Sequence, residues 1–128
     1  STYRLYMRSA SNSFTLYQFG YNPATQDYEF GYNSTAVLFI TMSPLDADHS
    51  RWAMAHDGTR YQLYIGKQNS ADTFYQHAYN PSSGDYEYGF SSPYDVLVVL
   101  NMPADSIKDN FMMLDDGTNN RFYYLSDL

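Results

Sequence analysis

Hydrophobic and polar residues alternate along much of the chain, which is the pattern of β-strands. In the segment TLYQFGYN, which begins at Thr15, the aromatic residues Tyr17 and Phe19 fall on one face of the expected strand. Leu16 and Gln18 fall on the other face. The alternation therefore predicts a strand with one aromatic face and one face of small, apolar and amide residues.

Other segments extend this β pattern. DYEFGY, which begins at Asp27, repeats the alternation, and the loop NPATQD before it carries Asn, Pro and Asp, which are typical of turns. AVLFI (36–40) and VLVVL (96–100) are unbroken apolar runs, which predict strands buried on both faces. Together with the remaining segments, they lead us to expect about eleven strands joined by short connections.

Proline and glycine mark the turns between these strands. SPLDAD and MPADSIKD place acidic residues after a proline, which predicts short helical turns near residues 44–50 and 103–109. The Asp-Gly pairs in HDGT (56–59) and DDGT (115–118) predict tight hairpin turns.

One tyrosine-rich phrase occurs twice in the chain. YNPATQDYEFGY begins at Tyr21, and YNPSSGDYEYGF begins 58 residues later, at Tyr79. The match extends to YRLYM and YQLYI before the phrase and to AVLFITMSPLDAD and DVLVVLNMPADSI after it. The first strand returns a third time as NRFYYL. The chain therefore contains two repeats, at residues 3–59 and 61–118, and one further strand at 120–126.

These features predict an all-β fold. We expect a single domain over residues 1–128, a pseudo-two-fold symmetric antiparallel barrel or sandwich built from the two repeats. The strand at 120–126 would pair with the first repeat and close the sheet, which removes an exposed edge. Two alternatives stay open: alternation does not separate barrel from sandwich, and the last strand could belong to a third repeat of a longer array.

Composition narrows the range of partners. Charged residues make up 16% of the chain, against about 25% in ordinary domains, while 15 residues are tyrosine. The net charge of −7 argues against nucleic acid and anionic membranes as partners. No apolar run approaches the roughly 20 residues of a membrane helix, so we expect a soluble protein without membrane insertion. The absence of cysteine excludes disulfides and thiolate metal sites.

The doubled phrase has a structural and a functional interpretation. In each hairpin, amides and carboxylates share one face with small residues, and aromatic rings line the other. The structural interpretation is that the rings form the core and the polar face is solvated. The functional interpretation is saccharide binding, because sugars stack their C–H faces on rings and bond their hydroxyls to amides and carboxylates.

We therefore expect a non-catalytic, lectin-like carbohydrate-binding module with two related sites and no cofactor. Two sites would favour multivalent neutral glycans, and an extracellular or cell-surface location is favoured. The candidate ligand-binding residues are Gln18, Asn22, Asp27, Tyr28 and Glu29 in the first repeat and Gln76, Asn80, Asp85, Tyr86 and Glu87 in the second.

The sequence argues against catalysis and metal binding. Asp27 and Glu29 would lie about 6.6 Å apart on one strand, near the carboxyl separation of glycosidases. They lie beside each other rather than on either side of a bond, so we expect no enzyme, although glycoside hydrolysis is the activity that these residues fit best. DADHS begins like a calcium loop but lacks the later Gly and Glu, so no metal site is expected.

The alternative function is a structural or adhesive β-module. Tyrosine-rich faces make good protein interfaces, so such a module could self-associate, for example as a homodimer, or bind another protein. Arg4 and Arg121, which lie close to Tyr6 and Tyr123, could stack on rings or line a site, and they fit solvated strand positions equally well. Self-association that added sugars do not affect would favour this module over a lectin.

Overall fold

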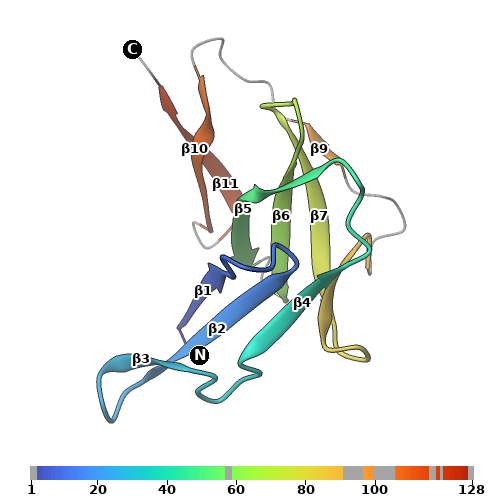
Figure 1. Cartoon of the computed structure of the whole chain (residues 1–128). Helices are drawn as coiled ribbons and strands as arrows, with labels where there is room; N and C mark the ends of the chain where they lie inside the picture. Colours follow the sequence, from blue (N-terminus) through green and yellow to red (C-terminus); the bar gives the residue numbers. More distant parts are fainter. Residues whose placement is uncertain are drawn as a thin grey trace.

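The chain is all-β. The computed structural model describes residues 3–56, 59–90, 97–99, 106–115, 118 and 120–126. These residues contain eleven strands and no helix, and hence no helix that could cross a membrane (Figure 1). The strands are β1 Arg4–Arg8, β2 Thr15–Asn22, β3 Asp27–Phe30, β4 Val37–Thr41, β5 Ala47–His56, β6 Tyr61–Lys67, β7 Thr73–Asn80, β8 Asp85–Tyr88, β9 Leu97–Val99, β10 Ser106–Asp115 and β11 Asn120–Ser126.

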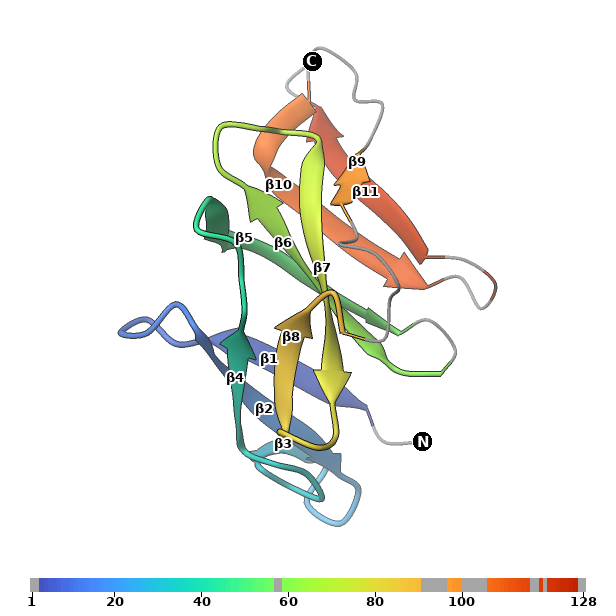
Figure 2. The ribbon, with the colours of Figure 1, turned by 90° about the vertical axis from the view of Figure 1, so that its right-hand side faces the viewer.

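Nine strands form one curved sheet. Its order is β1-β2-β4-β8-β7-β6-β5, with β3 added to β2 and β9 added to β7. The pairing of β4 with β8 is parallel, and the other pairings are antiparallel. The sheet curls until the ring of Tyr6 on β1 comes within 5.7 Å of the ring of Tyr61 on β6. The result is a nearly closed barrel, against which the two-stranded sheet of β10 and β11 packs (Figure 2).

Equivalent strands pair in the same way in the two repeats. We call the sheet layer of β1–β4 unit 1 and the sheet layer of β5–β9 unit 2. In unit 1 Leu5 lies opposite Phe19, and in unit 2 Leu63 lies opposite His77. The hairpins that carry the doubled phrase also share one register, because Tyr21 pairs with Tyr28 and Tyr79 with Tyr86. The repeat in the sequence is thus a repeat of local strand pairing.

Two apolar cores lie on the two sides of the sheet of unit 2. Core 1 lies between unit 1 and unit 2, and its buried members are Leu16, Leu38, Ile40, Ala47, Leu63, Ile65, Tyr75 and Tyr86. Core 2 lies between unit 2 and the β10–β11 sheet, and it contains Ala55, Tyr64, Phe74 and Met113 together with the partly buried Phe111 and Phe122. Burial of these side chains supplies most of the favourable free energy of folding.

The predicted pseudo-two-fold symmetry is not confirmed. Leu63 and Ile65 are fully buried, whereas the equivalent residues Leu5 and Met7 are 46% and 52% exposed. The expectation that the aromatic faces form the core holds for unit 2, where Tyr75 is buried, but not for unit 1, where Phe30 is 55% exposed. Equivalent positions differ because, among the residues that the structure describes, unit 2 has a layer on both sides and unit 1 has a layer on one side.

Two predictions about single elements are wrong. Residues 44–50 form no helical turn: the Ala47 amide donates to the Pro44 carbonyl in one tight turn, and β5 then begins at Ala47. Pairing with β6 outweighs the local helical preference. β4 is not buried on both faces, since Leu38 and Ile40 enter core 1 while Phe39 is 50% exposed.

The last strand also differs from its prediction. In the part of the chain that the structure describes, β11 pairs with β10 and not with β1, so it does not close the barrel. Of the helical turn expected near 103–109, residues 103–105 lie outside the described residues, and 106–109 belong to β10. The Asp-Gly pairs at 57–58 and 116–117 also lie outside them, although the strands that flank each pair are antiparallel partners.

Candidate functional site

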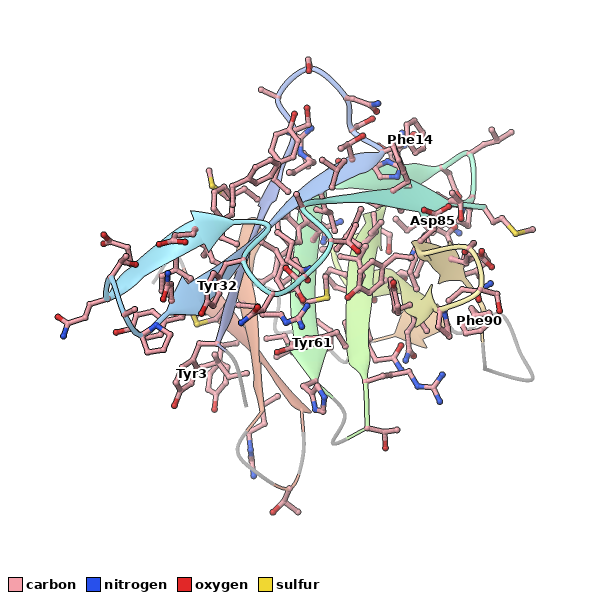
Figure 3. All side chains as sticks on the ribbon, turned by 90° about the horizontal axis from the view of Figure 1, so that it is seen from below. Tyr3, Phe14, Tyr32, Tyr61, Asp85 and Phe90 are labelled. Atoms are coloured by element: carbon pink, nitrogen blue, oxygen red, sulfur yellow. The ribbon has the colours of Figure 1, made fainter. Side chains whose placement is uncertain are left out.

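A pocket of about 460 Å³ lies where unit 1 meets the start of β6 and the β7–β8 hairpin. Its aromatic wall consists of Tyr6, Tyr61, Tyr79 and Tyr86. Its polar wall consists of Arg4, Gln18, Ser34, Thr35, His56, Thr59 and Arg60, and Leu38 completes the described lining. In Figure 3 the loop after β3, marked by Tyr32, lies beside the start of β6, marked by Tyr61. The pocket therefore requires both units.

Gln18 is held at the polar wall by the fold. Its side chain is 3% exposed, its Nε2 donates to the Thr35 carbonyl at 2.9 Å, and its Oε1 accepts from Arg4 Nη1 at 2.9 Å. The Arg4 guanidinium carbon also lies 6.0 Å from the centre of the Tyr61 ring, within the range of a cation–π interaction. These contacts leave Arg4 and Gln18 with little rotational freedom, so the wall is preorganised.

The aromatic wall is built from rings that support one another. Tyr61 packs edge-on against Tyr6 and against His56, with ring centres 5.7 and 4.9 Å apart. Tyr79 and Tyr86, which are cross-strand partners, have ring centres 5.6 Å apart. Rings fixed in this way present flat apolar surfaces to a ligand.

Two phenols of this wall, those of Tyr6 and Tyr86, stay neutral. Burial raises the pKa of Tyr6 to about 12, with a further increase from the neighbouring Tyr61. Burial likewise raises the pKa of Tyr86, which lies next to the Tyr6 hydroxyl. Both hydroxyls therefore act as uncharged hydrogen-bonding groups at physiological pH.

Most of the carboxylates and amides in the doubled phrase close the hairpin loops. Asn22 Nδ2 donates to Glu29 Oε1 at 2.9 Å, and the Thr25 hydroxyl donates to the same oxygen at 2.7 Å. Unit 2 repeats this arrangement, with donation to Glu87 Oε1 from Asn80 Nδ2 at 3.0 Å and from Ser83 at 2.6 Å. These bonds lower the pKa of Glu87. The recurrence of the phrase thus has a structural reason.

The remaining predicted residues are spread over the surface. Asp27 and Tyr28 are exposed, and the Tyr28 ring packs on Tyr21 at 5.4 Å between centres. Asp85 and Gln76 are half-buried. Of the ten predicted site residues, the pocket brings together Gln18 of unit 1 and Tyr86 of unit 2.

Sequence reasoning missed much of the pocket. Tyr61, Tyr79 and His56 line it but lie far from Gln18 in the sequence, and only the packing of unit 1 on unit 2 brings them together. The sequence suggests Arg4 as a residue that could line a site, because it lies close to Tyr6. In the fold, Arg4 is among the residues that line the pocket.

A second polar cluster lies away from the pocket. Ser43 Oγ is 2.7 Å from Nε2 of the fully buried His77 and 3.3 Å from Nε2 of His49. Burial lowers the pKa of His77 to about 4 and also lowers that of His49, so both rings are neutral near pH 7. Within the described residues, no group of three or more His, Asp or Glu side chains is arranged to hold a metal ion.

No protein-family model, curated protein or solved structure matches this chain. The residues themselves are therefore the basis for any proposal about function.

Proposed function

We propose that the chain is a non-catalytic saccharide-binding module and that its ligand occupies the pocket between unit 1 and unit 2. The observation that carries the proposal is the combination of fixed tyrosine rings with the immobilised Gln18 amide and Arg4 guanidinium. Rings pack on the apolar face of a sugar, a directed amide donates to and accepts from its hydroxyls, and a guanidinium donates to them. The volume of about 460 Å³ suits one or two sugar rings.

The charge of the pocket refines the class of sugar. Two arginines, Arg4 and Arg60, are among the described lining residues, and none of those residues is acidic. The chain as a whole carries a net charge of −7, so cationic groups at one pocket are a local feature. They extend the expected ligands from neutral sugars to sugars that bear a carboxylate, which pairs well with a guanidinium.

The state of the hairpin carboxylates argues against glycoside hydrolysis and so favours a binding module. A glycosidase needs a carboxylic acid with a raised pKa to protonate the leaving group. Hydrogen bonds from Ser83 and then Asn80 lower the pKa of Glu87 instead. Glu29 accepts the same two kinds of hydrogen bond, so both glutamates serve the loops.

The pocket supports one saccharide site per chain rather than two. Gln18 lines it, whereas the equivalent Gln76 does not. Gln18→Ala and Gln76→Ala therefore form a matched pair of variants. We expect Gln18→Ala to weaken saccharide binding about tenfold, from the loss of roughly one hydrogen bond, and Gln76→Ala to leave it unchanged.

Isothermal titration with neutral hexoses, uronic acids and their disaccharides would measure these affinities. Gln18 also forms hydrogen bonds with Arg4 and Thr35, so circular dichroism must show that the Gln18→Ala variant is folded. Tyr61→Leu at the aromatic wall gives a second test of the pocket. Equal weakening by Gln18→Ala and Gln76→Ala would support two hairpin sites instead of the pocket. Failure of every saccharide to bind the wild-type chain would reject the proposal.

A further inference from the structure

Exposed apolar side chains gather on one face of unit 1. This front face contains Leu5, Met7, Tyr17, Phe19 and Phe30. They form one continuous surface, because Leu5 lies opposite Phe19, Met7 opposite Tyr17, and Phe19 opposite Phe30. Leu5, Met7 and Phe30 are each about half exposed. The front face is therefore an apolar surface that no other layer covers in the part of the chain that the structure describes.

A second exposed apolar surface lies on the β10–β11 sheet. This back face contains Met112, Leu114 and Tyr123, which are 55%, 54% and 48% exposed. Met112 lies directly opposite Tyr123, so the three side chains share one side of the sheet. β10 and β11 lie at one end of the molecule, and β1, β2 and β3 lie at the other (Figure 2).

Residues of unit 2 that correspond to front-face positions are buried, and they show what kind of surface can cover such a face. Leu63 and Ile65 of unit 2, which correspond to Leu5 and Met7, are packed in core 1. The side chains that cover them there include Leu16 and Leu38, from the other side of the unit 1 sheet. In core 1, therefore, the back of one layer covers the front of the next.

Core 2 repeats this relation one layer further along. Tyr64 and Phe74, on the back of unit 2, pack against Phe122, which corresponds to Leu5 and Leu63 in the sequence. The Phe122 ring lies 5.7 Å from the Tyr64 ring and 5.2 Å from the Phe74 ring, between centres. The chain thus makes the same back-to-front contact twice, and in the part of the chain that the structure describes one front and one back are left over.

We propose that the leftover faces bind each other between copies, so that the back face of one chain packs on the front face of a second chain. The partner is a second copy because the chain itself carries both surfaces of this contact. Each leftover face consists of the same kinds of apolar side chain that form the contact inside the chain. The interface joins different surfaces of the two molecules, so it leads to rings or open chains rather than a two-fold dimer. This association does not depend on a ligand in the saccharide pocket.

Two methionine variants separate the two faces. Met7→Lys places a charge on the front face, and Met112→Lys places one on the back face, at side chains of similar exposure. Met42→Lys is the matched control, because Met42 is 75% exposed and belongs to neither face. Each lysine also reduces the net negative charge, so loss of association would not come from added repulsion between like-charged molecules.

Sedimentation velocity from micromolar to millimolar concentration tests the proposal, with circular dichroism to verify folding. The wild type and Met42→Lys should associate, and either face variant alone should associate about tenfold more weakly or not at all. An equimolar mixture of Met7→Lys and Met112→Lys should form dimers that grow no further, since each variant keeps one intact face. A monomeric wild type, association by either face variant alone that is as tight as that of the wild type, or a mixture that stays monomeric would each overturn the proposal.

Discussion

Single residues show how the layers packed around a repeated position change the role of the side chain there. Phe19 lies on the front face of unit 1, and the equivalent position in unit 2 holds His77, which is fully buried against Tyr88 and Ser43. Burial explains why the pKa of His77 falls from 6.5 to about 4. The neutral imidazole fits a site that would strongly disfavour the charged form.

His77 should make stability depend on pH. Below pH 6.5 the unfolded chain binds a proton at this residue and the folded chain does not, so stability falls as the pH drops from 6.5 towards 4. The expected loss is about 1.4 kcal/mol per pH unit at most. His49, whose pKa is also lowered, adds to the slope. In His77→Phe the slope should be clearly smaller, as measured by urea unfolding at several pH values between 7 and 5. Equal slopes in the two proteins would contradict the buried neutral histidine.

At the scale of elements, the β2–β3 and β7–β8 hairpin loops have the same backbone geometry. In both copies the residue before the second strand has a left-handed backbone, with φ of +62° at Gln26 and +79° at Gly84. Their amides donate to the carbonyls of Asn22 and Asn80, each at 2.8 Å. The geometry is the same, but only unit 2 places a glycine where glycine is favoured.

Exchange of these two residues should have opposite effects. Gly84→Gln should lower the free energy of unfolding by about 1 kcal/mol, because a side chain disfavours the left-handed region. Gln26→Gly removes that strain at the cost of a more flexible unfolded chain, so it should leave stability unchanged or slightly raised. Chemical denaturation of both variants measures this. A similar loss in both would contradict the equivalence of the two loops.

Local pairing was predictable from the sequence, and burial was not. The alternation from Thr15 to Asn22 predicts β2 with its observed bounds, and the Asn-Pro loop predicts the β2–β3 hairpin, because both depend on neighbours in the sequence. Which face is buried depends on the next layer. Leu5 and Leu63 occupy equivalent positions, and of the two only Leu63 is covered by another layer of the described strands.

At the scale of the whole molecule, the pocket exists only where two layers meet. Gln18 and Tyr86 could be proposed from the repeated hairpin, and Arg4 from its place near Tyr6. Tyr61 could not, because no local pattern shows that the start of β6 faces the loop after β3.

Association between the back face of one copy and the front face of the next would add a second consequence. Copies joined in this way would display several pockets and gain avidity for multivalent glycans.

The most direct test of the saccharide pocket is NMR chemical-shift mapping of the isotopically labelled chain with neutral and acidic sugars. We expect shifts in the Gln18 side-chain amide and in the rings of Tyr61 and Tyr79, with the Asn22 and Asn80 amides unaffected. Shifts confined to the Asn22 and Asn80 hairpins, or no shift with any sugar, would contradict it.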